Sequence, residues 1–333
     1  MTYARIAGTG MYAPGESISN TELMSIAGIE FDAARYEEKI GIHHRHIARL
    51  RNMDETTADF AEKAATAALA DARIDAGDVD LFIVATDTPE YISPPTAVLL
   101  QGRLQGAQKN AGSFDVNASC AGFATAFDTA ARIVATDPDV QVAVVTGVYN
   151  MPAYARDGDA FGLSIFADGA GSFVLTKADS AGYLATARVS DGTQWDFVGV
   201  YAGGTKRPIT HEVLDEGTYG LQLLKRLPGD RNVRLWPDVV RRVAERAGFA
   251  IGDIDQVIYT QINRSVIEQV NGILGIPMAK SHTIMDRFGY TGSACVPMAF
   301  ADAAAREKVQ RGDRVVFVAS GAGLAVTANA FIY

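Results

Sequence analysis

The sequence contains only two cysteines, Cys120 and Cys295, among 333 residues. Two thiols cannot make a disulfide framework, so we expect both to be reduced, and each needs its own explanation. No apolar run approaches the roughly 18 residues that a membrane-spanning helix requires. The opening residues, MTYARIAGTG, also lack the basic segment and apolar run of a secretory signal. These absences predict a cytoplasmic protein that does not span a membrane.

An excess of positive charge is also missing, because 30 Lys and Arg residues stand against 39 Asp and Glu residues, for a formal net charge of -9. Nucleic-acid-binding proteins need a cationic surface to replace the counterions on phosphates, so this balance argues against that class. Two local basic clusters remain, at residues 45–51 and 231–246. Either could attract an anionic partner. The second cluster fits a solvated helix face equally well.

The sequence has no low-complexity tract or flexible linker, because its 32 glycines and 11 prolines are spread along the chain. No group of His, Cys and carboxylate side chains has the spacing of metal ligands, so we expect no metal and no resident cofactor. Apolar residues make up 48 % of the chain, which is enough for a large buried core. We therefore expect one compact unit.

What the chain does contain is an internal repeat. The segment GDVDLFIVAT at 77–86 returns as GDIDQVIYTQ at 252–261. Two further pairs of segments keep the same order and nearly the same offset: 124–132 with 298–306, and 142–147 with 315–321. Three matches in one order indicate a duplication.

Each half runs helix, apolar strand, helix, apolar strand, an order typical of parallel strands joined by helical crossovers. The strands at 81–86 and 114–116 are apolar on both faces, which favours a sheet covered on both sides. The sequence thus predicts an α/β protein with an N-terminal half at 1–178 and a C-terminal half at 179–333. A five-layer α/β/α/β/α arrangement, with the two halves pressed together, would explain the repeat.

Cys120 lies in the segment FDVNASCAGF, where a predicted strand gives way to a predicted helix. The free N–H groups and positive dipole end of a helix N-terminus favour anions. We therefore expect the thiol to have a lowered pKa and to attack carbonyl groups as a thiolate. The alternative is a small buried apolar cysteine, which is how we interpret Cys295.

The segment NASCAGF resembles the nucleophile motif of β-ketoacyl-acyl-carrier-protein synthase III, a family of thiolase-like condensing enzymes. The resemblance extends over nearly the whole chain, through RIAGTGMYAPGESISNTEL, KIGIHHRHIA, FADGAGSFVL and GYTGSACVPMAF. It implies a thiolase-like fold, a homodimer and a reaction in two steps. An acyl coenzyme A or acyl-carrier thioester first acylates the cysteine. A malonyl-carrier thioester then attacks the acyl group with loss of carbon dioxide.

The resemblance also implies that the backbone N–H groups of Cys120 and Ala322 hold the oxyanion of the thioester. The sequence departs from the family at two catalytic positions: Thr260 replaces the family's histidine, and Tyr290 replaces its asparagine. Their hydroxyls can still donate hydrogen bonds to a carbonyl. Because losing one oxyanion donor costs about 2.7–4 kcal/mol of barrier, losing two predicts an impaired decarboxylative step. Acyl loading on Cys120 is expected to survive.

The remaining substrate contacts are implied by the same resemblance. Arg35 and Lys39 stand where the family binds coenzyme A. Asn263 and Gly289 belong to the two altered catalytic segments, and we expect them to contact substrate as well. Ser93 occupies the position where the dimer partner limits acyl length, so a small residue there predicts a pocket for longer acyl chains.

The expected function is that of an acyltransferase in fatty-acid or secondary-metabolite biosynthesis, similar to a 3-oxoacyl-acyl-carrier-protein synthase III. The loaded acyl group would pass to an acceptor, either by condensation or by transfer to an oxygen or nitrogen nucleophile. Of the five histidines, only His211 in the irregular region 195–230 is expected to be free to reach the site. Two alternatives stay open: a non-catalytic partner subunit of a related ketosynthase, and an oligomeric protein that binds acyl thioesters.

Overall fold

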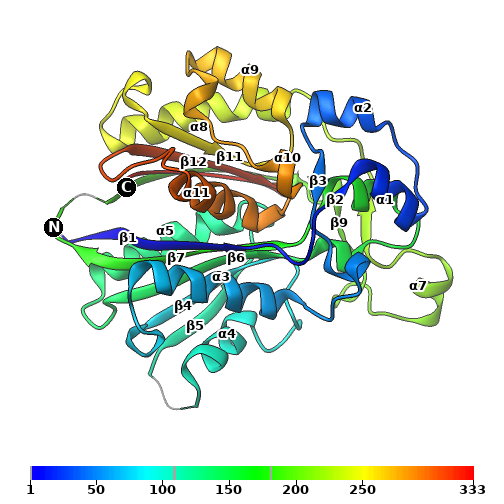
Figure 1. The fold of residues 1–333 in the computed structure, drawn as a ribbon, viewed down its shortest axis with the longest axis horizontal. Coiled ribbons are helices and arrows are strands. Elements are labelled where there is room, and N and C mark those ends of the chain that lie inside the picture. Colours follow the sequence, from blue (N-terminus) through cyan, green and yellow to red (C-terminus); the bar gives the residue numbers. More distant parts are fainter. Residues whose placement is uncertain (1, 108–109, 181) are drawn as a thin grey trace.

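The computed structural model describes residues 2–107, 110–180 and 182–333. Two main sheets form its frame (Figure 1). The first sheet has five strands in the order β1 (Tyr3–Tyr12), β7 (Gly169–Ala178), β6 (Val142–Tyr149), β4 (Leu81–Ala85) and β5 (Gly112–Val116). The second has four strands in the order β11 (Gln256–Tyr259), β12 (Arg314–Gly321), β13 (Gly323–Ile332) and β8 (Tyr183–Gln194).

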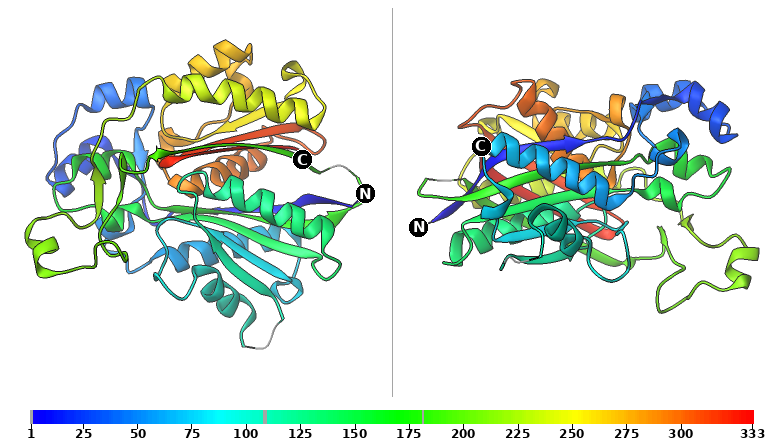
Figure 2. Two further views of the ribbon diagram at one scale, coloured as in Figure 1. Left: turned by 180° about the vertical axis from the view of Figure 1, so that it is seen from behind. Right: turned by 60° about the horizontal axis from the view of Figure 1, so that its bottom comes forward.

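Helices cover the outer face of each sheet and fill the space between the sheets (Figures 1 and 2). In layer order they are α3 (Thr57–Ala72) and α4 (Thr96–Gln105), then α5 (Gly122–Thr136) and α11 (Cys295–Ala305), then α8 (Arg231–Ala247) and α9 (Arg264–Leu274). The middle pair, α5 and α11, contacts strands of both sheets. The α/β fold in five layers that the sequence predicts is confirmed.

The sequence repeat corresponds to a repeat of topology. In the first sheet β4 is parallel to β6, and in the second sheet β11 is parallel to β12. The next strand is antiparallel in both cases, β7 beside β6 and β13 beside β12. The two matched pairs of strand segments therefore occupy the same positions in their sheets, and the third pair forms the equivalent helices α5 and α11.

Phe127 of α5 shows how the middle helix layer packs between the two sheets. The side chain is 1 % exposed, and its ring lies 5.8 Å from Phe173 of β7 and 5.4 Å from Phe331 of β13, edge-on in both cases. Such aromatic contacts add to the free energy gained by burying the rings. One residue of the middle layer thus packs against both sheets.

The two strands predicted to be covered on both sides differ. All five residues of β4 are buried, as expected. Strand β5 is only half-buried over most of its length, because it lies at the edge of its sheet. Within the ranges that the structure describes, no helix is long and apolar enough to cross a bilayer.

Most of the shorter elements gather at the end of the molecule away from the two termini (Figure 1). The short strands and helices are β2 (Ile18–Ser19), α1 (Asn20–Ala27), α2 (Ala33–Arg35), the π-helix η1 (Tyr36–Ile40), β3 (His44–Arg45), α6 (Ala160–Ile165), β9 (Val198–Val200), α7 (His211–Asp215), β10 (Leu221–Leu223) and α10 (Met285–Phe288). Single 3₁₀ turns lie at Ala48–Arg51, Ala76–Asp78, Met151–Tyr154, Ile251–Asp253, Met278–Lys280 and Gly292–Ala294. Several of these elements wall the cavity described next.

Candidate active site

A cavity of about 450 Å³ opens beside Cys120. Its wall comes from both halves of the chain, since Cys120 follows β5 while Ile262 follows β11. Most of the wall is apolar, and Ile165 of α6, Val198 of β9 and Leu221 of β10 contribute to it. A concave, largely apolar space with a few polar groups is the usual form of a ligand site.

A sharp turn between β5 and α5 presents Cys120 to this cavity. The Asn117 side-chain oxygen accepts a hydrogen bond from Ser119 N at 3.0 Å, and Ser119 O accepts one from Gly122 N at 2.8 Å. Ser119 has a φ of 47°, in the left-handed region that residues other than glycine seldom occupy. The end of β12 lies in close contact with this turn: a Cβ added at Gly321 would lie only 2.7 Å from Cys120 N. A glycine at this position lets β12 end against the backbone of Cys120.

The thiol of Cys120 is buried, with 9 % of the residue exposed. Burial raises its pKa well above the usual range, and the nearby Asp87 carboxyl raises it further. The Tyr290 hydroxyl hydrogen-bonds with the thiol and acts in the opposite direction. The lowered pKa expected from the helix N-terminus is therefore wrong, because loss of solvent outweighs the N–H groups at the start of α5. The resting thiol is protonated and must lose its proton to react.

Tyr290 is held firmly beside the sulfur. Its backbone N–H donates to Ile165 O at 3.1 Å, and its carbonyl accepts from Ala167 N at 2.9 Å. Its ring packs 5.6 Å from Phe166 and 6.4 Å from Tyr149, between centroids. Burial raises the pKa of the Tyr290 hydroxyl well above its ordinary value, so this group stays protonated and can donate to a sulfur anion.

Thr260 does not reach the cavity. It lies fully buried after β11, where its hydroxyl accepts a hydrogen bond from Ser320 N at 2.8 Å and bonds to a carbonyl of β12. These contacts join β11 to β12, so the hydroxyl is not available to a substrate carbonyl as the sequence predicted. Gly289 is also off the cavity wall: its φ is 65°, and a Cβ there would lie 2.9 Å from the Arg45 Cβ. It turns the chain into Tyr290 instead of touching substrate.

Ala322 and Asn263 both line the cavity, and their predicted roles stay predictions. Ala322 follows Gly321 at the end of β12, next to the turn that carries Cys120. The Asn263 side-chain oxygen accepts from Val266 N at 3.3 Å and caps helix α9. Asn263 thus has a structural use in addition to its place in the site.

The other predicted residues lie outside the cavity wall. Arg35 and Lys39 are exposed on the segment that reaches the wall at Ile40. Ser93 is exposed on the loop between β4 and α4. His211 is exposed at the start of α7, and among the described residues no histidine lines the cavity.

Two charged side chains on the cavity wall are absent from the predicted site. Asp87 follows β4, the parallel neighbour of β5, and this position at the carboxyl end of a strand is the signal that could have revealed it. Arg231, predicted as part of a basic surface cluster, begins α8 and donates to Gln194 Oε1 at 3.2 Å. Burial lowers the pKa of Arg231, while Tyr290 and Cys120 favour its charged form.

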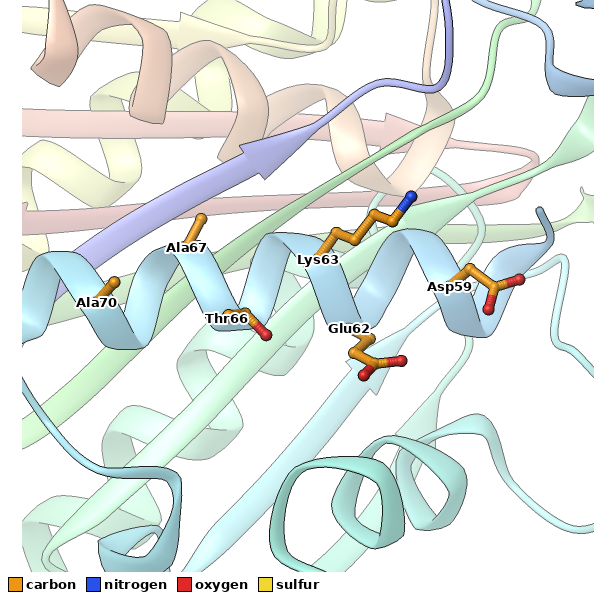
Figure 3. Close-up of a pocket in the computed structure, with 6 residues that line it drawn as sticks. All are labelled: Asp59, Glu62, Lys63, Thr66, Ala67 and Ala70. Atoms are coloured by element: carbon orange, nitrogen blue, oxygen red, sulfur yellow. The ribbon is translucent and has the colours of Figure 1, made fainter. Parts of the chain in front are cut away.

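Another hollow lies along α3, away from Cys120 (Figure 3). Its walls all belong to that helix: Asp59, Glu62, Lys63, Thr66, Ala67 and Ala70. The two acidic groups already bond to Arg103 of α4, at 2.9 and 3.1 Å. Lys63 is likewise paired with Glu55, so the charged groups that line this hollow are already paired and it is not the candidate site.

A thiolase-like five-layer fold with a buried cysteine at a strand-to-helix turn is typical of the condensing enzymes, and comparisons with known proteins identify the family. Residues 114–192 match the family 3-oxoacyl-[acyl-carrier-protein] synthase III, and residues 244–333 match its C-terminal part. The β-ketoacyl-[acyl-carrier-protein] synthase III of Xanthomonas campestris pv. campestris is 34 % identical over 328 residues, covering 96 % of this chain and 95 % of the relative. The chain belongs to the 3-oxoacyl-[acyl-carrier-protein] synthase III family.

Solved structures agree with this assignment. The 3-oxoacyl-[acyl-carrier-protein] synthase III of Aquifex aeolicus VF5 superimposes with a TM-score of 0.86 at 29 % identity, covering 99 % of this chain and all of the other (100 %). The priming β-ketosynthase of the R1128 polyketide biosynthetic pathway has a TM-score of 0.88 at 27 % identity, covering 99 % and 96 %. The whole described fold is thus that of a condensing enzyme.

Proposed function

We propose that this condensing-family enzyme is an acyltransferase that loads an acyl group from a coenzyme A or carrier-protein thioester onto Cys120 and passes it to an acceptor. The observation that carries the proposal is the position of Cys120 on the wall of a largely apolar cavity, with the Tyr290 hydroxyl bonded to its thiol. The apolar wall suits an acyl chain. Strand β12 ends against the turn that carries Cys120, since a Cβ at Gly321 would lie 2.7 Å from Cys120 N, and the backbone N–H groups of Cys120 and Ala322 are the proposed oxyanion donors.

Intact mass after incubation with a panel of acyl thioesters tests the loading step. We expect a mass increase of one acyl group in the wild type and none in Cys120→Ala. Cys295→Ala is the matched control, because Cys295 is fully buried and does not line the cavity. It should load normally. If no donor in the panel gives an adduct, the proposal fails and the non-catalytic partner subunit becomes the better interpretation.

We further propose that the acyl group is transferred without decarboxylative condensation. Two features support this proposal: the Thr260 hydroxyl accepts a hydrogen bond from the backbone of β12, and the Tyr290 hydroxyl hydrogen-bonds with the sulfur of Cys120. Neither is left to bind an enolate oxygen. Malonyl carrier protein added to the loaded enzyme should release little carbon dioxide. Release at the rate of acyl transfer would overturn this second part and leave the loading step intact.

The donor site and the assembly are proposals of the same kind. Arg35 and Lys39 are exposed near the Ile40 end of the cavity, where their charges could meet the phosphates of coenzyme A or of a carrier arm. Ser93 lies on an exposed loop, so its proposed effect on acyl length needs a second copy of the chain placed as in a homodimer. Labelling with short and long acyl donors, combined with light scattering, tests both. Labelling by acetyl groups alone would contradict the larger pocket.

A further inference from the structure

Asp87 and Cys120 meet at one edge of the first sheet. Strands β4 and β5 are parallel neighbours with Ala85 opposite Val116, so the segments that follow them leave the sheet at the same edge. Asp87 comes shortly after β4, and Cys120 comes shortly after β5. Both side chains line the cavity, and the carboxyl charge acts on the thiol.

Asp87 is not bonded as a structural carboxyl would be. Asp115 on β5 shows the structural pattern, since its two oxygens accept from Thr96 N at 2.7 Å and Ala97 N at 2.8 Å at the start of α4. The Asp87 carboxyl receives hydrogen bonds from its own backbone N–H and from the Ser119 hydroxyl, but its Oδ1 is buried and has no hydrogen-bond partner within the described residues. A buried polar oxygen without a partner is costly, which points to a partner supplied by a ligand.

We propose that Asp87 is the general base that activates the acceptor of the acyl group. Its carboxylate takes the proton of an O–H or N–H group while that oxygen or nitrogen attacks the acyl carbonyl on Cys120. The assignment rests on the proposed acyl transfer and makes it more specific, because it identifies the acceptor as a neutral alcohol or amine.

The step balances without any further reactant. A C–O or C–N bond forms as the acceptor attacks, and the carbonyl oxygen becomes an oxyanion beside the N–H groups of Cys120 and Ala322. The oxyanion then collapses and breaks the C–S bond. Asp87 returns its proton to the departing sulfur, which leaves an ester or amide and the free thiol of Cys120.

No other described side chain on the cavity wall is suited to take this proton near neutral pH. The wall has no histidine or lysine, and burial raises the pKa of the tyrosine and cysteine groups, so they stay protonated. Burial raises the pKa of Asp87 to about 6, so it is ionised at neutral pH yet more basic than an ordinary carboxylate. Asp87 interacts electrostatically with Tyr149 of β6, with Tyr154 in the turn that follows, and with Cys120 in the β5–α5 turn. The ionisable groups Arg231 and Tyr290 line the same cavity.

The same charge disfavours decarboxylative condensation. A carboxylate beside Cys120 repels the carboxylate of a malonyl thioester and the enolate that remains after carbon dioxide leaves. Attack by a neutral acceptor meets no such repulsion. The position of Asp87 therefore fits the replacement of the family's histidine and asparagine by Thr260 and Tyr290.

The test follows decay of the acyl adduct after loading with a p-nitrophenyl acyl ester, an activated donor. Water and 1-butanol serve as acceptor probes, and intact mass is read from pH 5 to pH 9. In the wild type we expect decay to accelerate with pH and level off above an apparent pKa near 6. Asp87→Asn should slow decay by about 10²- to 10⁴-fold and remove the pH step. Asp87→Glu should restore part of the rate and the step.

Asp115→Asn is the matched control, since it alters a structural carboxyl at the same sheet edge. It should lower the Tm and keep the pH step. If Asp87→Asn loads and then decays at the wild-type rate with the same pH step, Asp87 is not the base. A wild type that takes up no acyl group overturns the proposed function itself. The loaded fraction, measured before the acceptor is added, separates the two failures.

Discussion

The hydroxyl of Tyr290 hydrogen-bonds with the thiol of Cys120 and lowers the pKa of that thiol, so Tyr290→Phe should make the thiol harder to ionise. The ring is held by neighbouring aromatic rings and by two backbone hydrogen bonds. Removing only its oxygen should leave these contacts in place. The change therefore isolates the hydrogen bond between the hydroxyl and the sulfur.

The size of the effect follows from the strength of that hydrogen bond. A hydrogen bond to a charged group contributes about 1.5–3 kcal/mol. Since 1.36 kcal/mol corresponds to one pKa unit, the pKa of Cys120 should rise by about one to two. The thiolate fraction falls in proportion, but a more basic thiolate is also more nucleophilic, with a Brønsted coefficient of about 0.4–0.5. The net loss in alkylation rate at fixed pH is about 4- to 15-fold.

Alkylation of Cys120 by iodoacetamide, followed by intact mass between pH 6 and pH 10, measures this change. The rate profile of Tyr290→Phe should move to higher pH. Tyr149→Phe is the control. It removes a buried hydroxyl group from the same cavity wall, and this hydroxyl does not bond to the sulfur of Cys120. An unchanged profile in Tyr290→Phe, or an equal slowing in Tyr149→Phe, would refute the reasoning.

Three further outcomes are expected. Gly321→Ala places a Cβ 2.7 Å from Cys120 N, so it should lower the free energy of unfolding by about 1–3 kcal/mol and slow the acylation of Cys120. Gly192→Ala, where the added Cβ meets open space, should have neither effect. Urea unfolding and the rate of acyl loading measure the two effects. Ala322→Pro removes the backbone N–H of residue 322 and should slow acyl loading by about 10²- to 10³-fold, whereas Ala322→Gly keeps the N–H and should load normally. Equal loading rates in the two variants would exclude the N–H of residue 322 as an oxyanion donor. Hydrogen bonds from an imidazole and two guanidinium groups hold the pKa of Asp302 below its usual range, although burial opposes them. Its contribution to stability is thus present above about pH 4 and lost as the pH falls further, so Asp302→Asn should lose less stability between pH 5 and pH 3 than the wild type in acid unfolding.

The local and repeated features of the fold could be read from the sequence. The segments at 77–86 and 252–261 became β4 and β11 at matching positions of two sheets, because apolar strands and amphipathic helices form from short-range patterns. Cys120 was predicted between a strand and a helix and lies there. The sequence also predicts that the chain departs from its family at positions 260 and 290.

Only the tertiary structure decided what surrounds these residues. The sequence predicted similar roles for the hydroxyls of Thr260 and Tyr290. In the structure the Thr260 hydroxyl hydrogen-bonds with the backbone of the neighbouring strand β12, whereas the Tyr290 hydroxyl hydrogen-bonds with the sulfur of Cys120. The pKa of Cys120 is raised because burial depends on packing by both halves, which no local pattern records. Asp87 lies far from Cys120 in sequence, and only the parallel pairing of β4 and β5 brings the two together. The sequence by itself thus determined the elements and the position of the candidate nucleophile, while long-range packing determined its solvation, its neighbouring charges and its hydrogen-bond partners.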